Sequence, residues 1–252
     1  MSESVILPTR KDEAWRYSDV DALAGMDLGR FDDWRDIEVP AGETFRDTLV
    51  LDSEDGVELR RIRVKLGEKA RCELFAVNAG GQLGRIEVVV TASRGSHFEF
   101  GGVTLGGGNT TREFVTCMAH EEPEATSNQV VRSVHWGRGT GNFLGRIDVV
   151  RDAQKTDAAQ DFKGLLLEKG ASANTVPQLE IFADDVKCAH GATVGRLDEA
   201  ARYYMAARGI PPEAAKRLLV RAFLADAFVG LDDEAERERL LGIAIATMDA
   251  QL

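Results

Sequence analysis

The sequence is poor in the residues that mark several classes of protein. It has three cysteines, Cys72, Cys117 and Cys188, without a C-x-x-C pair, which argues against a disulfide framework. No apolar run approaches the roughly 20 residues that span a bilayer, and the first residues lack a cleavable signal pattern. Sparse, unpaired cysteines favour a reducing compartment, so we predict a cytoplasmic protein without a membrane partner.

Positive charge is scarce as well. The chain has 31 Lys and Arg against 42 Asp and Glu, which gives a formal net charge of −11. An acidic protein repels phosphate backbones, so nucleic acid is not expected as a partner. The densest basic run, residues 60–65, alternates with apolar residues in the manner of the solvent face of a strand.

Catalytic and phosphate-binding motifs are also missing. The chain has neither a P-loop nor a G-x-S-x-G elbow. Its glycine clusters, 101–102 and 106–108, lack dinucleotide-binding spacing and are predicted to form turns. Adjacent acidic residues such as Asp184 and Asp185 would face opposite sides of a strand, which makes them poor paired catalysts. The motifs therefore do not predict an enzyme.

The chain divides into three regions. Residues 1–35 are predicted to be an N-terminal arm with a short helical segment, pinned to the body by Trp15. Residues 36–196 contain β-like segments about ten residues apart with glycine-bearing turns between them, which fits a sandwich, a barrel or a coiled β-helix. No clean repeat of 20–50 residues selects among these three folds.

Residues 197–252 are predicted to form a helical domain. Asp198 suits a helix N-cap, Gly209 a helix end, and Pro212 the first turn of the next helix. Apolar residues at helical spacing predict packing faces, formed by Ala215, Leu218, Leu219, Ala222 and Phe223 in one helix and by Leu240, Leu241, Ala244, Ile245 and Met248 in the last. A partner protein could cover whatever apolar surface these helices leave exposed.

The richest local chemistry is at Cys188 and His190. Residues two apart on a strand share a face, so both side chains should point the same way. Thiolate and imidazole both bind metals and clusters, but two ligands do not make a stable site. The remaining cysteines and histidines show no metal-ligand spacing, so the residues alone favour a buried thiol and a hydrogen-bonded imidazole.

Several stretches together resemble the SufB/SufD family of iron–sulfur cluster assembly scaffold proteins. The most specific is LEIFADDVKCAHGATVGRLD at 179–198. Further matches are Leu7–Tyr17, Ala159–Leu167, Tyr203-Tyr204, Arg208–Pro211 and Leu218–Phe223. The SufD branch is the better match, because SufB-like chains carry a cysteine where this chain has Asp161 and a glutamate where it has Gly191.

The resemblance implies a mainly β fold with α. Its core would be a right-handed parallel β-helix over 36–196, between the N-terminal arm and the C-terminal helical domain. It also implies a non-catalytic scaffold that pairs with SufB and binds the SufC ATPase, and that holds no cofactor stably. The residues expected to bind SufC are Tyr203, Tyr204, Ile210, Pro211, Leu219 and Phe223.

The resemblance further implies that Cys188 and His190 lie at the SufB interface. There His190 would help SufB hold a transient iron–sulfur cluster, with a role in iron acquisition. Three alternatives stay open: a SufB-like homodimer that binds a cluster itself, an adaptor with an inert His190, and a carbohydrate-active β-helix enzyme. A homodimer of the isolated chain is also compatible with the family.

Overall fold

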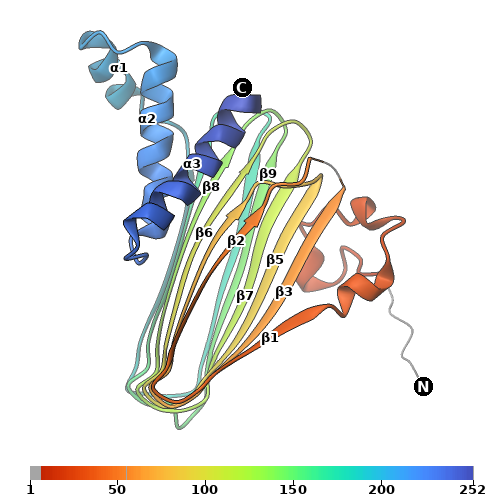
Figure 1. Cartoon of the computed structure of the whole chain (residues 1–252), viewed down its shortest axis with the longest axis vertical. Coiled ribbons are helices and arrows are strands. Elements are labelled where there is room, and N and C mark those ends of the chain that lie inside the picture. The colour runs from red at the N-terminus through yellow and green to blue at the C-terminus, as the bar shows by residue number, and fades with distance from the viewer. Residues whose placement is uncertain (1–6, 55, 252) are drawn as a thin grey trace.

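The computed structural model describes residues 7–54 and 56–251, and parallel β-strands dominate it (Figure 1). The described strands form two parallel sheets of six. The first sheet contains β1 (Trp34–Val39), β3 (Val57–Leu66), β5 (Leu83–Ala92), β7 (Thr111–His120), β9 (Thr140–Val149) and β11 (Ser172–Ile181). The second contains β2 (Thr44–Leu51), β4 (Arg71–Asn78), β6 (His97–Gly106), β8 (Thr126–His135), β10 (Asp157–Leu166) and β12 (Lys187–Gly195).

Successive strands alternate between the two sheets, so the chain winds as a solenoid of about six turns. Val57 pairs with Leu83 near one end and Thr140 with Ser172 near the other, so a turn takes between 26 and 32 residues. The predicted right-handed parallel β-helix is confirmed, whereas the sandwich and the barrel are not observed.

Side chains from both sheets fill the interior of the solenoid. Residues in register stack from one turn to the next, as Ile86, Phe114 and Phe143 do on β5, β7 and β9. Phe143 and Phe162 stack from opposite sheets with ring centroids 5.8 Å apart. Strand alternation therefore separates an inward row that packs from an outward row that meets solvent or a covering segment.

The C-terminal region covers the outer face of the second sheet. It consists of α1 (Glu199–Ala207), α2 (Pro212–Ala225), the 3₁₀ turn η4 (Asp226–Phe228) and α3 (Glu234–Gln251). The apolar stripe predicted for the last helix is buried against this sheet, which confirms it. No described helix is long and apolar enough to cross a membrane.

Glycine lets the tail approach the sheet closely. Gly101 and Gly102 lie within β6, so the prediction that they form a turn is wrong. A Cβ at Gly101 would lie 2.0 Å from the carbonyl oxygen of Ala227, and a Cβ at Gly102 would lie 2.7 Å from the ring of Phe114. These glycines are needed for packing inside a strand, where the sequence signal resembles that of a turn.

The N-terminal arm lies on the outer face of the first sheet (Figure 1). It contains three 3₁₀ turns, η1 (Glu13–Trp15), η2 (Val20–Leu23) and η3 (Leu28–Phe31). Trp15 is buried there, and the guanidinium carbon of Arg85 lies 3.7 Å from the centroid of its ring. Ser18 donates a hydrogen bond to Glu113. Trp15 therefore pins the arm, as predicted.

Two buried histidines make stability sensitive to acid. Burial lowers the pKa of His120 to about 4 and that of His135 to about 3. The unfolded chain takes up these protons near pH 6.5, so the free energy of unfolding should fall as the pH drops below that value. Between pH 6.5 and pH 5, the free energy of unfolding of His135→Gln should decrease by about 2 kcal/mol less than that of the parent, as measured by urea unfolding. Identical pH slopes for the variant and the parent would contradict this assignment.

Candidate functional site

The last turn of the solenoid is open. Strands β11 and β12 end their sheets, and each pairs with a described strand on one side only. None of the residues of β12 is buried, whereas β10 beneath it alternates between buried and partly exposed positions. Phe182, just beyond β11, is 61% exposed. Unpaired backbone groups beside apolar side chains make this end a surface suited to another strand.

Cys188 and His190 lie on this terminal strand. They occupy the inward row of β12, in register with Ala158 and Gln160 of β10, which are both buried. Cys188 is half-buried and packs against the interior cluster. His190 is exposed because no described turn stacks on it. The two residues therefore lie on one face of the terminal strand, at the open end of the solenoid interior.

Gln160 is a fixed support beneath His190. Its amide nitrogen donates to the carbonyl oxygens of Gly145 and Gln178, each at 3.3 Å. A Cβ at Gly145 would lie 2.0 Å from the Gln160 side-chain oxygen, so the glycine makes room for the amide. The Gln160 side chain is therefore held by two backbone carbonyl groups at the position directly below His190 in the ladder.

The described thiols are not activated. Burial raises the pKa of Cys188, and the nearby charge of Asp157 raises it further. Burial also raises the pKa of Cys117, and that of Cys72 to about 12. A protonated thiol is a poor nucleophile and a poor metal ligand. The described residues contain no group of three potential ligands able to hold a metal ion.

Asp161 and Gly191 mark the outward side of the same two strands. Asp161 accepts a hydrogen bond from Arg132 at 2.5 Å, and Lys163 lies 3.5 Å away. Arg132 also reaches Asp226 of η4, again at 2.5 Å. A Cβ at Gly191 would come within 3.0 Å of the Asp161 carboxylate. The position of the SufB-type cysteine thus holds a charge network that anchors the helical tail.

The residues predicted to bind SufC fall into two groups. Tyr203 is 78% exposed and Tyr204 is 59% exposed, both on α1, which buries no residue and stands away from the solenoid (Figure 1). Pro211 is also exposed, whereas Ile210 and Leu219 are half-buried. Phe223 packs against the cluster between the helices and the sheet, so it has a structural contact as well.

The helical periodicity predicted the wrong environment for Leu218. It was predicted to lie on the packing face of α2 but is 49% exposed, and Ala222 is exposed with it. The buried residues of α2 are Ala215, Val220 and Leu224. Neighbouring apolar positions left two candidate faces, and contact with the sheet selects the one with Val220. Leu218 thereby joins the exposed apolar surface of the tail.

The Arg132 network generates a stability prediction. Arg132→Met should lower the free energy of unfolding by about 1–3 kcal/mol, because it removes the buried cation between Asp161 and Asp226 and leaves only the more exposed Lys163 to face both carboxylates. Arg146→Met is the control, since Arg146 also contacts two carboxylates, Asp148 and Glu180, but on an exposed face. We expect less than about 1 kcal/mol there. Equal losses in denaturant unfolding would contradict an anchoring role for Arg132.

Comparison with known proteins places this arrangement in a family. Residues 43–223 match the family described as "SUF system FeS cluster assembly, SufBD core domain". The match therefore covers the strand-rich centre as well as the motifs at 155–223.

Individual relatives agree with this match. The chain is 39% identical over 126 residues to the iron–sulfur cluster assembly protein SufD of Escherichia coli, covering 50% of this chain and 30% of the relative. It is 32% identical over 141 residues to SufD of Bacillus subtilis, covering 56% and 32%. A SufBD family protein of Synechocystis is 31% identical over 173 residues, covering 68% and 38%. The chain thus spans about a third of the length of these relatives.

Proposed function

The chain belongs to the SufBD core family, on the SufD side, and we propose that it is the scaffold subunit that pairs with SufB and recruits the SufC ATPase. A part in iron–sulfur cluster assembly by the SUF system, as a scaffold component, follows from the family. The observation that supports the finer proposal most is the open last turn, with His190 exposed on its terminal strand.

The open turn is where SufB would bind. A second β-helix set against β11 and β12 would satisfy their free backbone groups and cover Ile181, Phe182 and Val194, all of them exposed. This pairing would bring side chains of SufB next to His190. It also gives the exposed edge a function, since isolated edges of this kind promote aggregation.

At that interface His190 would be a ligand of the nascent cluster, which is the cargo of the complex. A neutral imidazole can bind iron through one nitrogen while its other nitrogen is held by an acceptor. Cys188 is half-buried and packs against the interior cluster, so we assign the sulfur donor at this interface to a cysteine of SufB. His190 would then contribute to iron acquisition.

The helical tail would bind SufC. Anchored by Arg132 through Asp226, it presents α1 away from the solenoid with Tyr203, Tyr204 and Leu218 exposed. Large aromatic side chains contribute strongly when a partner buries them. A projecting helical hairpin could transmit movements of an ATPase to the SufB interface.

Replacing His190 tests the chemical role. We expect His190→Ala to preserve the fold and the complex with SufB and SufC, but to lower cluster formation in that complex at least about tenfold. Iron and sulfide content and the visible absorbance after reconstitution would measure this. Lys187→Ala is the control, because Lys187 is exposed on the same strand. Normal cluster formation by His190→Ala would exclude a ligand role and leave an adaptor.

Replacing the tyrosines tests the tail. The double substitution Tyr203→Ala and Tyr204→Ala should weaken SufC binding at least about tenfold in a titration of the purified proteins. Val229→Ala removes another exposed apolar side chain of the tail and should leave the affinity unchanged. Retained SufC binding by the double variant would mean that SufC docks elsewhere.

Co-purification with SufB and SufC from the same source tests the proposal as a whole. A stable complex with both is the expected result. A homodimer that assembles a cluster without SufB would instead support the SufB-like alternative. The commitment of Asp161 to Arg132, and the described residues' lack of a three-ligand group, favour the pairing with SufB.

A further inference from the structure

The outer face of the first sheet carries a row of apolar side chains that the arm does not fill. Val115, Leu144 and Val176 are in register across β7, β9 and β11. The same row continues as Glu87 and Arg61 on the preceding strands, where these two side chains form an ion pair at 2.6 Å. The outward row is thus charged on β3 and β5 but aliphatic on β7, β9 and β11. Aliphatic side chains on an outward face suggest that another group covers them.

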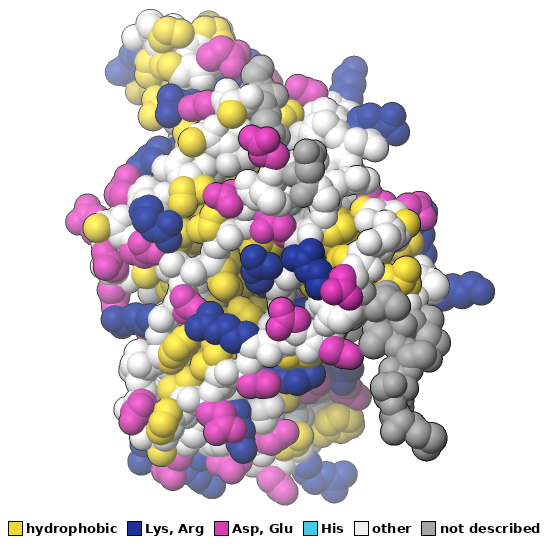
Figure 2. All heavy atoms as spheres, turned by 45° about the vertical axis from the view of Figure 1, so that its right-hand side comes forward, with side chains coloured by type: hydrophobic (Ala, Val, Ile, Leu, Met, Phe, Trp, Pro, Cys, Tyr) yellow, Lys and Arg dark blue, Asp and Glu magenta, His cyan; other side chains and the backbone are white. Residues whose placement is uncertain are grey.

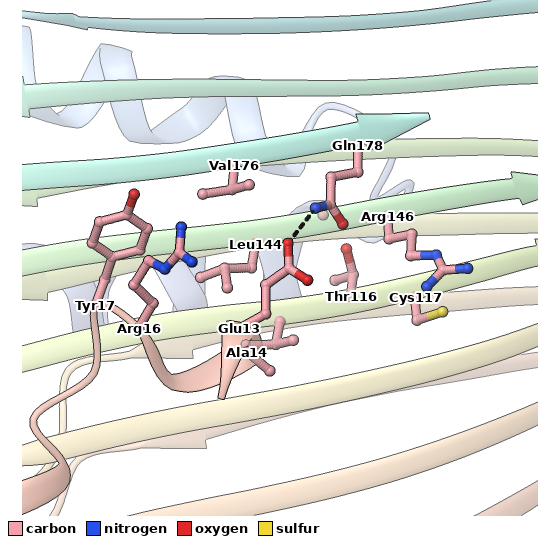
Figure 3. Close-up of a pocket in the computed structure, with 12 residues that line it drawn as sticks. Glu13, Ala14, Arg16, Tyr17, Thr116, Cys117, Leu144, Arg146, Val176 and Gln178 are labelled. Carbon is pink, nitrogen blue, oxygen red and sulfur yellow. Dashed lines mark hydrogen bonds between the residues drawn. The ribbon is translucent and has the colours of Figure 1, made fainter. Parts of the chain in front are cut away.

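The arm lies around the aliphatic row without packing its own apolar side chains onto it. Its own apolar side chains, including Trp15 and Leu23, gather with Leu59 and Leu83 near β3 and β5. Over the aliphatic row the arm presents Glu13, Ala14, Arg16 and Tyr17, and a hollow of about 310 Å³ remains between arm and sheet (Figure 3). Gln178 closes one side by donating to Glu13 at 2.8 Å. In Figure 2, hydrophobic side chains are visible among the charged ones on this side of the molecule.

A second, polar hollow of about 380 Å³ adjoins the first, and the two share Arg16 and Tyr17. Three arginines line it, Arg10, Arg16 and Arg138, against a single carboxylate, Asp19. Asp19 already accepts a hydrogen bond from Gln82 at 3.0 Å. Neither Arg16 nor Arg138 forms an ion pair with a residue in the described part of the chain, so both guanidinium groups can bind an anion.

We propose that these two hollows form one binding site for a small organic anion that has an apolar ring system at one end and a phosphate or similar group at the other. The ring system would lie on Val115, Leu144 and Val176, and the anionic group would meet Arg16 and Arg138. Arginine suits phosphate because its planar fork donates two parallel hydrogen bonds. The apolar hollow, of about 310 Å³, has the size of a small-molecule site.

Hydrogen bonds to the sheet hold the part of the arm that lines the site. The side-chain amide of Asn142 donates to the carbonyl oxygen of Tyr17 at 2.9 Å, and Ser18 donates to the buried Glu113. These contacts fix Tyr17, which lines both hollows, and Ser18, which lines the polar one, against the sheet. The site therefore exists before a ligand arrives, which lowers the entropic cost of binding.

Titration calorimetry of the full chain with 1-naphthyl phosphate tests the site, with inorganic phosphate and 1-naphthol as its two halves. We expect submillimolar binding of the whole probe, at least about tenfold tighter than either half. Added salt should weaken it, because the phosphate contact is electrostatic. Absence of saturable binding at millimolar concentrations, or binding no tighter than that of a half, would overturn the proposal.

Matched variants locate the binding. Arg16→Glu should weaken it at least about tenfold, whereas Arg151→Glu makes the same charge change at an exposed turn outside both hollows and should not. Val176→Thr should also weaken it, whereas Val89→Thr alters an outward residue of the same sheet outside the hollows. Equal effects of the members of either pair, in variants that keep the parent's circular dichroism, would also overturn the proposal.

Discussion

The structure depends on the register of its parallel ladders. Each strand must lie directly on its equivalent one turn below, because only then do inward side chains stack and backbone groups pair. Gln129, Gln160 and His190 show what this imposes, since they occupy one column through β8, β10 and β12. The first two are buried by the turn above them and His190 is not, so its exposure results from the column ending there.

The same constraint explains the glycines and the anchoring of the tail. Covering segments must approach a surface whose spacing the ladders have already fixed. Where approach is closest, at Gly101 beneath Ala227, no side chain fits. Where charge is available, Arg132 joins the solenoid to η4 through Asp161 and Asp226. The tail is thus held by both shape and charge, while α1 remains outside these contacts.

Much of this could be predicted from the sequence, and the failures have physical causes. The strand segments and the arm pinned by Trp15 were visible as alternation and as an isolated aromatic. The apolar–polar alternation of β3 is interrupted at Leu59, which lies in the outward row with Arg61 and Arg63 but is buried by the arm. The repeat was hidden because turns vary between 26 and 32 residues and because one inward column mixes Phe100 with Gln129.

The site divides in the same way. The C-x-H spacing predicted that Cys188 and His190 share a face, which the strand confirms. Their placement on the last described turn depends on how many strands stack, a property of the whole solenoid. The face of α2 was also ambiguous, because Leu218 and Val220 are both apolar and only the position of the sheet decides between them. The apolar hollow requires strands β7, β9 and β11 together, so no local signal marks it.

These placements also keep the surfaces of the scaffold apart. The strand edge with His190 lies at the end of the solenoid, the tail lies on the outer face of the second sheet, and the two hollows lie on the outer face of the first. The three proposed partners, a strand-bearing protein, an ATPase and a small anion, would therefore meet separate surfaces of the solenoid and would not compete directly. Coupling between them would have to pass through the stacked interior or through the Arg132 network, which links the terminal turns to the tail.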